Sequence, residues 1–175
     1  GSLANKFLIT SNGNPACEAD IVDGNQRVVA ARLYDAKFFY DEDLKLPLEA
    51  YVERLDEVVF QEKLGTTLAK TKRIVKIAEC LCAAAGIEGQ EKADVARAAY
   101  LCKADLVTGA VVEFTSVQGI MGSYYAKAAG ETDVVAGAIA DHYRPRFSGD
   151  ATPATRVGKA VAVADKLDTV CGLFR

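Results

Sequence analysis

The sequence predicts an all-α protein, a multi-helix bundle with a short irregular or strand-like segment at its N-terminus. Apolar residues recur every three to four positions through most of the 175 residues, as they do in amphipathic helices. Turn-forming residues separate several of these periodic segments. The alternation of apolar and polar residues that is typical of strands is weak after residue 30. Val111–Phe114 is the main strand candidate in that part of the chain.

The first 25 residues differ from the rest because they contain two clusters of turn formers. Phe7–Thr10 is interpreted as a short strand. Gly1 and Ser2 resemble the remnant of an expression tag, and no signal-peptide pattern follows them. The predicted organisation is therefore an irregular N-terminal segment over residues 1–25 and one helical domain over residues 26–175.

Helical periodicity and capping residues give the boundaries of the predicted helices. These are expected over residues 26–43, 47–55, 67–85, 91–106, 116–129, 132–143 and 152–171. Thr66 or Thr67 can cap the third helix, and Gly86 can end it. Thr152, followed by a proline, fits the start of the last helix. The acidic run Asp41–Asp43 is interpreted as a solvent-exposed helix end.

Composition narrows the class of protein. The net charge is −3, from 21 basic and 24 acidic residues, whereas free-standing nucleic-acid-binding domains are usually strongly basic. Any contact with RNA is therefore expected from a local patch. The five cysteines lack the paired spacing of a metal site, and we expect them to be reduced, mostly buried residues of a cytoplasmic protein. The apolar runs are too short to span a bilayer.

Five stretches carry a resemblance to a known family, and together they span nearly the whole chain. They are Gly24–Asp41, Phe60–Thr66, Glu113–Gly122, His142–Asp150 and Ala164–Phe174. In order and rough spacing they resemble the β subunit of the bacterial-type heterotetrameric glycyl-tRNA synthetase. The resemblance implies that this chain is an internal fragment of such a subunit.

That resemblance also implies a function without catalytic residues in the fragment. The chain would support aminoacylation of tRNA-Gly by positioning tRNA, by packing other domains, or by both. Its partners would be the α subunit, in a heterotetramer of two α and two β subunits, and tRNA-Gly. ATP and magnesium would be used by the whole enzyme through the α subunit, and the fragment would bind no cofactor.

A second resemblance, to HD-type metallophosphohydrolases, lies within the first. Those enzymes hold metal ions with a histidine on one helix, a His-Asp dyad on the next and an aspartate on a late helix. Three segments look like these elements, namely Lys70–Val75, Ala99–Asp105 and Val163–Leu167. On this reading Asp105 and Asp165 persist, whereas Lys70 and Ala104 stand in place of the two histidines.

The loss of both histidines favours a structural role for this degenerate HD-like site. Two carboxylates without an imidazole would hold a divalent metal only weakly, so we expect no bound metal. We expect Lys70, Asp105 and Asp165 to converge, with the Lys70 ammonium group replacing the metal as partner of one or both aspartates. An HD-type metal-dependent nucleotide phosphohydrolase is the alternative, disfavoured by the missing histidines.

His142, Tyr143, Arg144 and Arg146 are the candidate tRNA-contacting residues. Two guanidinium groups beside a proline suit phosphate oxygens, and the tyrosine ring can stack on a base. The alternative is that these arginines pair with Asp141, Asp150 or a helix C-terminus, and a scaffold without any RNA contact also fits the sequence. Gly119–Gly122 lacks the lysine of a phosphate-binding loop and is interpreted as a pair of helix-packing glycines.

Overall fold

The computed structural model describes residues 4–174, which form two compact units divided between Phe38 and Phe39. Gly1 and Ser2, interpreted above as a tag remnant, lie outside the described residues. Helices dominate both units, which confirms the all-α prediction. Within the described range no helix has both the length and the apolar character of a membrane span.

The first unit contains most of α1 (Glu18–Asp43), which begins eight residues before the predicted start at Gln26. A 3-10 turn, η1 (Pro15–Cys17), leads into α1, and the side chain of Asn14 caps this turn. The prediction was wrong because Gly24 was interpreted as part of a turn. A glycine inside a helix costs only about 1 kcal/mol, which a helix of 26 residues tolerates.

Phe7–Thr10 is not a strand. These four residues lie exposed in irregular backbone, and no strand of the described chain pairs with them. A strand is stable only beside another strand that satisfies its backbone groups. The alternating pattern at these positions was therefore insufficient to predict the structure.

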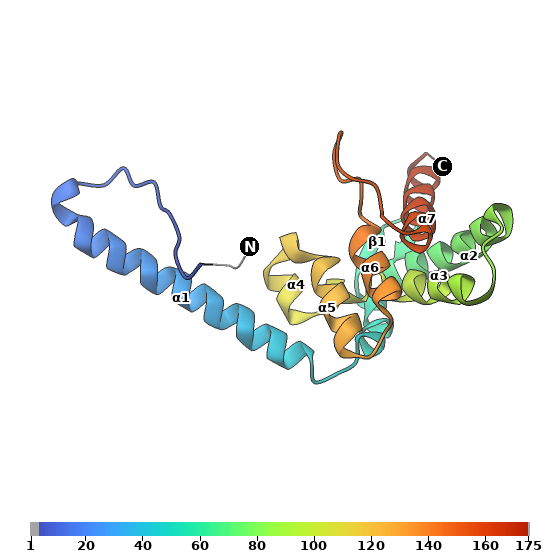
Figure 1. The fold of residues 1–175 in the computed structure, drawn as a ribbon, viewed down its shortest axis with the longest axis horizontal. Helices are drawn as coiled ribbons and strands as arrows, with labels where there is room; N and C mark the ends of the chain where they lie inside the picture. The colour runs from blue at the N-terminus through green and yellow to red at the C-terminus, as the bar shows by residue number, and fades with distance from the viewer. Residues whose placement is uncertain (1–3, 175) are drawn as a thin grey trace. The chain divides into compact units, whose positions relative to one another are not determined.

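The second unit contains the end of α1 and all later elements (Figure 1). In chain order these are η2 (Leu48–Tyr51), η3 (Glu53–Glu57), β1 (Val59–Gln61), β2 (Gly65–Thr66), α2 (Thr67–Ala85), α3 (Gly89–Leu101), η4 (Ala104–Val107), α4 (Gly109–Glu113), η5 (Thr115–Val117), α5 (Ile120–Ala128), α6 (Asp133–Asp141) and α7 (Arg156–Leu173). Helices α2, α3, α6 and α7 pack against one another, and α5 packs against α6.

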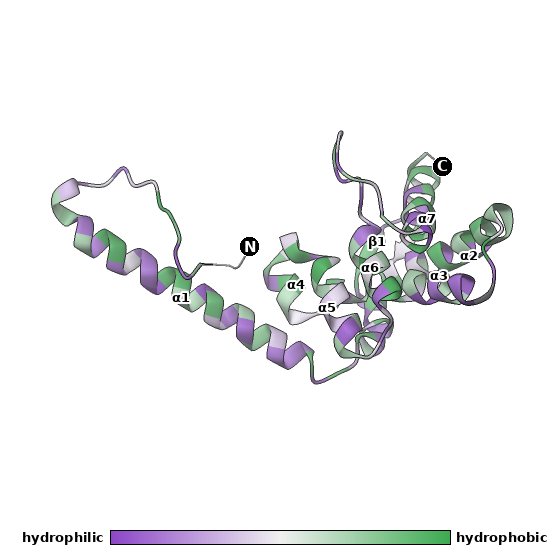
Figure 2. Ribbon diagram, viewed as in Figure 1, coloured by the Kyte–Doolittle hydropathy of each residue, from purple (hydrophilic) through white to green (hydrophobic). Residues whose placement is uncertain are grey.

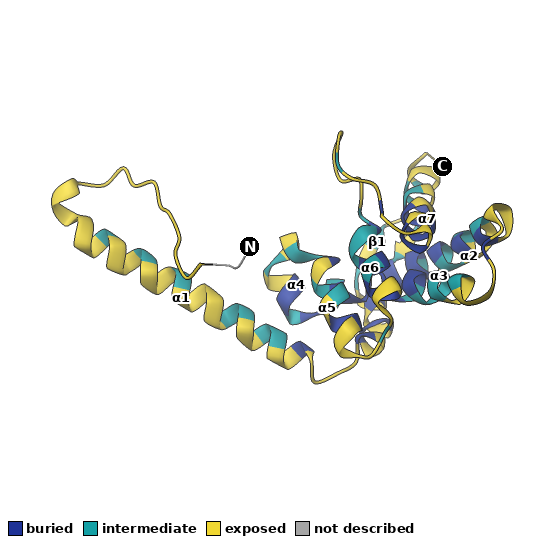
Figure 3. Ribbon diagram, viewed as in Figure 1, coloured by how far each residue is buried: buried dark blue, intermediate teal, exposed yellow. Residues whose placement is uncertain are grey.

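The core of the second unit lies between these helices. Figure 2 shows apolar and hydrophilic residues mixed along α2, α3 and α7, as expected of amphipathic helices. In Figure 3 the buried residues of these helices lie toward the interior of the bundle. Among the largest fully buried side chains are Leu55, Ile74, Leu101 and Ile139. The bundle therefore has one continuous apolar core.

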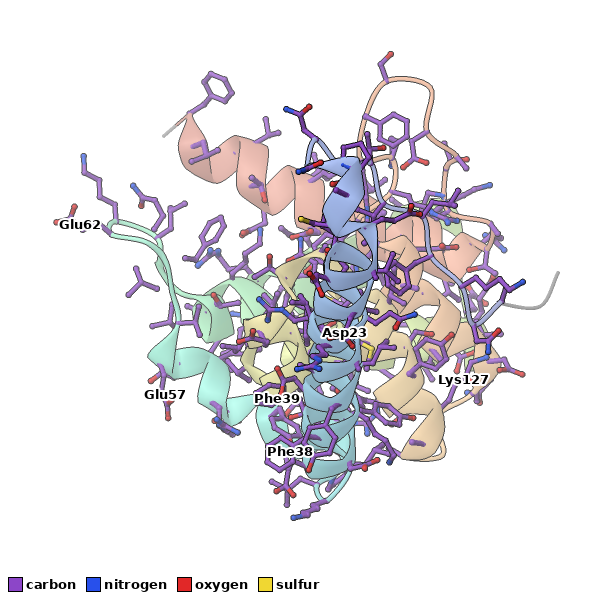
Figure 4. The ribbon with its side chains drawn as sticks, turned by 90° about the vertical axis from the view of Figure 1, so that its left-hand side faces the viewer. Asp23, Phe38, Phe39, Glu57, Glu62 and Lys127 are labelled. Atoms are coloured by element: carbon purple, nitrogen blue, oxygen red, sulfur yellow. The ribbon has the colours of Figure 1, made fainter. Side chains whose placement is uncertain are left out.

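A small hairpin is the part of the second unit that the sequence did not predict. Strands β1 and β2 pair antiparallel, with Val59 opposite Thr66. Figure 4 shows Glu62 at the exposed turn between the strands. The strands contain only three and two residues, which is too short for an alternating pattern to be recognised.

Several predicted helix ends are confirmed. The Thr66 hydroxyl accepts a hydrogen bond from the backbone N–H of Ala69 at 3.2 Å and caps α2. Gly86, with φ of +60°, ends the same helix in the left-handed conformation. Thr132 caps α6 by accepting from the N–H of Val135 at 3.2 Å.

Other boundaries were wrong. The helix predicted over residues 116–129 is interrupted at Gly119, whose φ of +78° no helix accommodates. The last helix has Thr155 as its N-cap instead of Thr152. The segment 47–55 forms parts of two 3-10 helices where one α-helix was expected. The start of the last helix was misplaced because Thr152 and Thr155 are both residues that can cap a helix.

The cysteines are free, as expected, but only two are buried. Cys82 and Cys102 lie in the core, and burial raises the pKa of the Cys102 thiol to about 12. Cys17, Cys80 and Cys171 are exposed, which corrects the expectation that most would be buried. Their apolar neighbours in sequence did not indicate which side of each helix faces the core.

Val111–Phe114 was predicted as a strand candidate, but most of it belongs to helix α4. The N–H groups of Gly109 and Ala110, at the start of α4, donate to the carboxylate of Asp43 at 2.7 and 2.9 Å. This carboxylate caps α4 from a position 66 residues earlier in the chain. No local pattern could reveal a contact over that separation.

Asp43 itself was predicted to be solvent-exposed, and this was wrong. It is 6% exposed, and its carboxylate also accepts a hydrogen bond from the hydroxyl of Tyr125 at 2.7 Å. The backbone carbonyl of Asp43 accepts another from Tyr51 at 3.0 Å. Asp43 therefore joins the end of α1 to η2, α4 and α5.

We predict that Asp43→Ala lowers the free energy of unfolding by about 2–4 kcal/mol, because it leaves two backbone N–H groups and one buried hydroxyl without their acceptor. Glu42→Ala is the matched control, since Glu42 precedes Asp43 and forms an exposed ion pair with Lys45. Its cost should stay below about 1 kcal/mol. Urea unfolding followed by circular dichroism measures both, and equal costs would refute the capping role of Asp43.

Candidate functional site

Lys70 lies near the start of α2, on the face that packs against α7, and only 5% of its side chain is exposed. Its Nζ lies 3.0 Å from Oδ1 of Asp165 and 3.1 Å from Oδ2 of Asp168. It also donates to the hydroxyl of Thr169 at 2.7 Å. The ring of Phe60 covers the ammonium group, with its centroid 4.4 Å from Nζ. Lys70 is thus a buried cation with two carboxylate partners on α7.

A second buried lysine, Lys103, was not anticipated from the sequence. It lies at the break between α3 and η4, inside the helix predicted over residues 91–106. Its Nζ is 2.9 Å from Oδ2 of Asp165 and 2.8 Å from Nε2 of His142. It also lies 4.1 Å from the centroid of the Tyr143 ring. A lysine among buried positions in the HD-like segment was the signal that could have revealed it.

The Asp165 carboxylate therefore lies between two ammonium groups. Burial by itself would raise the pKa of Asp165, but the neighbouring Lys103, His142 and Lys70 outweigh burial and lower the pKa to about 2. Asp165 is ionised at neutral pH as a result. The Oδ1 atom pairs with Lys70 without a well-aligned hydrogen bond, whereas Oδ2 accepts one from Lys103.

Lys70, Lys103, Asp165 and Asp168 form a buried charge cluster, which Arg73 extends toward the hairpin. Its Nε and Nη2 donate to the two carboxylate oxygens of Asp168, and its Nη1 donates to the carbonyl of Leu64 at 2.9 Å. Bidentate pairing of an arginine with a carboxylate is among the stronger charge-assisted contacts in proteins. Asp168, like Asp165, thus has two cationic partners.

Asp105 lies elsewhere in the same core. Its Oδ2 accepts hydrogen bonds from the N–H groups of Gly119 and Gly122 at 2.5 and 3.0 Å, and its Oδ1 is buried without a hydrogen-bond partner. Burial raises the pKa of Asp105. The structure thus brings Lys70 to Asp165, while no ion pair joins Asp105 to Lys70 in the described part of the chain.

Both glycines lie where a side chain would collide with neighbouring groups. A Cβ on Gly122 would lie 3.0 Å from Oδ2 of Asp105, and one on Gly119 would lie 2.7 Å from the ring of Tyr143. The segment that begins α5 therefore binds a carboxylate of the protein itself. Its backbone N–H groups are the donors that in other proteins bind phosphate.

His142, the single histidine of the chain, is fully buried. Its Nδ1 lies 2.6 Å from the carbonyl oxygen of Ile139, which can only accept, so Nδ1 carries the proton. Nε2 then accepts a hydrogen bond from Lys103. Burial and the Lys103 charge lower the pKa of His142 well below its usual value, so the ring is neutral at pH 7. His142 is therefore not available to a ligand in the way the sequence suggested.

Tyr143 and the three residues after it form a loop, the arginine loop, in which Arg144 and Arg146 are both exposed. Arg144 forms an ion pair with Asp141 at 3.0 Å, with 46% of its side chain exposed. The guanidinium of Arg146 lies 5.6 Å from the centroid of the Tyr143 ring and donates to the carbonyl of Gln118 at 3.3 Å. The pairing alternative thus holds for Arg144, and both guanidinium groups keep exposed surface.

Lys166 anchors this loop to α7. Its Nζ donates to the carbonyl oxygens of His142 at 3.1 Å and of Arg144 at 2.8 Å. On the inner side, the Tyr143 ring contacts the imidazole of His142, with 3.9 Å between the ring centroids. The loop is therefore held from two sides, by Lys166 and by the buried charge cluster beneath Tyr143.

The donor set of the cluster suits cationic side chains better than a metal ion. Both oxygens of Asp165 face ammonium groups, and Oδ2 of Asp105 accepts hydrogen bonds from two backbone N–H groups. Among the residues that the structure describes, no three histidine, cysteine or acidic side chains are grouped so that they could hold a metal ion. The absence of bound metal in solution stays a prediction.

We predict that Asp165→Asn costs about 3–5 kcal/mol of unfolding free energy, because two buried ammonium groups lose their shared counter-charge. Lys70→Met should cost less, about 1–3 kcal/mol, since Asp165 keeps Lys103 and Asp168 keeps Arg73. The exposed Lys76→Met is the control, with an expected change within about 0.5 kcal/mol. Urea denaturation with and without manganese measures all three, and manganese should shift none of them. A Lys70→Met protein as stable as the control would show that the ion pair contributes nothing.

The buried neutral His142 predicts a pH dependence of stability. Its pKa is lowered in the folded state, so its contribution is complete above the unfolded value near 6.5 and is lost as the pH falls below it. Between pH 6.5 and 5 the wild-type protein should lose about 2 kcal/mol for this reason. In His142→Gln, whose amide oxygen can still accept from Lys103, that part of the loss should disappear. Urea unfolding at pH 5, 6 and 7 provides the comparison, and parallel pH profiles for the two proteins would contradict it.

Comparison with known proteins gives the family. The profile of the glycyl-tRNA synthetase beta subunit matches residues 1–175. Glycine–tRNA ligase beta subunits of Trichodesmium erythraeum, Methylobacillus flagellatus and Clostridioides difficile are 49, 51 and 49% identical over 96, 99 and 99% of this chain. The chain spans 23, 24 and 25% of those relatives, about a quarter of their length. It therefore belongs to the glycyl-tRNA synthetase β-subunit family.

Proposed function

We propose that this chain is a non-catalytic part of a glycine–tRNA ligase and supports aminoacylation of tRNA-Gly by positioning the tRNA and packing against other domains. The observation that carries the tRNA-positioning role is the loop with Arg144 and Arg146. It presents two partly exposed guanidinium groups from a backbone that Lys166 fixes on α7. The relatives' names, glycine–tRNA ligase beta subunit, supply the substrate class.

Phosphate oxygens are the chemical group that this loop suits. A guanidinium donates two parallel hydrogen bonds to a phosphate, and a fixed backbone reduces the entropy lost when the contact forms. Arg144 shares its charge with Asp141, so Arg146 is the stronger candidate for a direct contact. Since the whole chain carries a net charge of −3, we expect a local contact that is sensitive to salt.

The buried cluster serves stability in this proposal. Its carboxylates are already neutralised by Lys70, Lys103 and Arg73, so they are not free to activate a water molecule. We interpret it as a degenerate HD-like site in which lysine side chains, instead of a metal ion, neutralise the carboxylates. A nucleotide phosphohydrolase would need a metal that stays bound and acidifies its water, and these residues give no support to that alternative.

The whole enzyme, in this proposal, performs its chemistry elsewhere. Glycine activation with ATP and magnesium belongs to the α subunit, and two α and two β subunits form the cytoplasmic heterotetramer. This chain contributes no catalytic residue and binds no cofactor of its own.

The test uses the full-length β subunit assembled with its α subunit. Arg144→Ala combined with Arg146→Ala should raise the Kd for tRNA-Gly about tenfold and make binding less dependent on salt, because phosphate contacts are removed. Lys72→Ala combined with Lys76→Ala removes the same charge from the exposed surface of α2 and should leave the Kd unchanged. Glycine-dependent pyrophosphate exchange should be the same in all three proteins. Unchanged tRNA affinity in the arginine variant would leave only the packing role.

A further inference from the structure

Helices α2 and α7 pack side by side, and two hollows lie in succession along the seam between them. One, of about 360 Å³, is lined by Leu81 on α2 and Val163 on α7. The other, of about 390 Å³, is lined by Ile77 on α2 and Leu167 on α7. The lining residues of the two hollows are four positions apart on each helix, so the hollows follow each other at about one helical turn and we treat them as one groove. We call it the α2/α7 groove.

The α7 side of this region carries an exposed apolar stripe. Val163, Leu167 and Val170 are 45, 41 and 53% exposed, and Phe174 beyond the helix end is 90% exposed. Their spacing of four, three and four residues places them along one face of the helix. A stripe of this kind on a helix that already buries its opposite face is typical of a binding surface.

The groove is long enough for a short helix. From Ala160 to Cys171, which line its two ends, α7 rises by about 17 Å, or three helical turns. Amphipathic helices bind grooves of this kind by inserting apolar side chains from successive turns. The shape and the apolar lining therefore suit a helical segment better than a small molecule.

The charged residues at the rim of the groove indicate which charge the bound segment carries. Lys159 lines one end and forms no ion pair within the described chain. Arg156, beside it, is paired with Glu91 at 3.0 Å. At the other end Asp168 is already bound by Lys70 and Arg73. Among the described residues that line the groove, the unpaired charge is thus positive and lies at the Lys159 end, which favours an acidic residue at the matching end of the occupant.

We propose that the α2/α7 groove binds an amphipathic helix of the same β-subunit polypeptide, from outside these 175 residues, with an acidic side chain facing Lys159. About three quarters of the length of the related subunits lies outside the matched region. A segment tethered on the same polypeptide is present at a high effective concentration, which favours it over a free partner. The inference rests on the packing role in the proposed function and is independent of tRNA binding.

Cys171 reports on this groove because it is exposed and lines it. The rate at which a maleimide labels Cys171, followed by peptide mass spectrometry, is compared between the 175-residue chain and the full-length β subunit. Labelling should be at least tenfold slower in the full-length subunit. Lys159→Glu in that subunit should restore most of the rate, whereas Lys72→Glu, the same change on an exposed position outside the groove, should not.

Four results would overturn the proposal. Equal labelling in both chains would show that nothing covers the groove. Protection that requires added α subunit would assign the groove to that subunit. Protection of the 175-residue chain alone that grows with its concentration would identify a second copy as the occupant. Protection unaffected by Lys159→Glu would remove the acidic contact. Because tRNA is absent from the assay, none of these results bears on the arginine loop.

Discussion

The ionised carboxylate of Asp165 is the group on which the interior of the helical domain depends. A lysine in a protein core is costly unless a counter-charge lies beside it, and here two lysines share one aspartate. Through their ion pairs with Asp165, Lys70 joins α2 to α7 and Lys103 joins the end of α3 to α7. Burial opposes ionisation of Asp165, yet the neighbouring Lys103, His142 and Lys70 lower its pKa to about 2. The helices of the bundle are thus joined by charge as well as by apolar packing.

The cluster also reaches the surface. Lys103 donates to Nε2 of His142 and lies against the ring of Tyr143, the residue that begins the arginine loop. Lys166, next to Asp165 in sequence, holds the backbone of that loop from the other side. Asp165 and Lys166 point in different directions from α7, so one helix supports both the buried cluster and the exposed loop. A change in the cluster is therefore expected to alter the presentation of Arg146.

If the chain is related to HD domains as proposed, cationic side chains have replaced the metal ion as the partners of Asp165. A metal ion would need the carboxylate oxygens of Asp165 as electron-pair donors. These oxygens already face the ammonium groups of Lys70 and Lys103. The second aspartate, Asp105, has become a ligand for the backbone of Gly119 and Gly122. The positive charge of Lys103 stabilises both carboxylates, so a cation of the protein itself supplies part of the charge that a metal would bring.

The sequence by itself determined the all-α class, a threonine cap and the Gly86 end of α2, and an aspartate partner for Lys70, because periodicity and capping are local and because family motifs carry long-range information. The structure decided that Thr66 is the cap and that the partner is Asp165 and not Asp105. Only the tertiary structure decided what depends on contacts between distant segments. These include the capping of α4 by Asp43, the role of Lys103, and the burial of His142. A pattern of residue types indicates which face of a helix is apolar, but it does not say which distant group will meet a polar side chain on that face. Buried polar groups must find partners across the fold, and those partners exist only once the helices have packed.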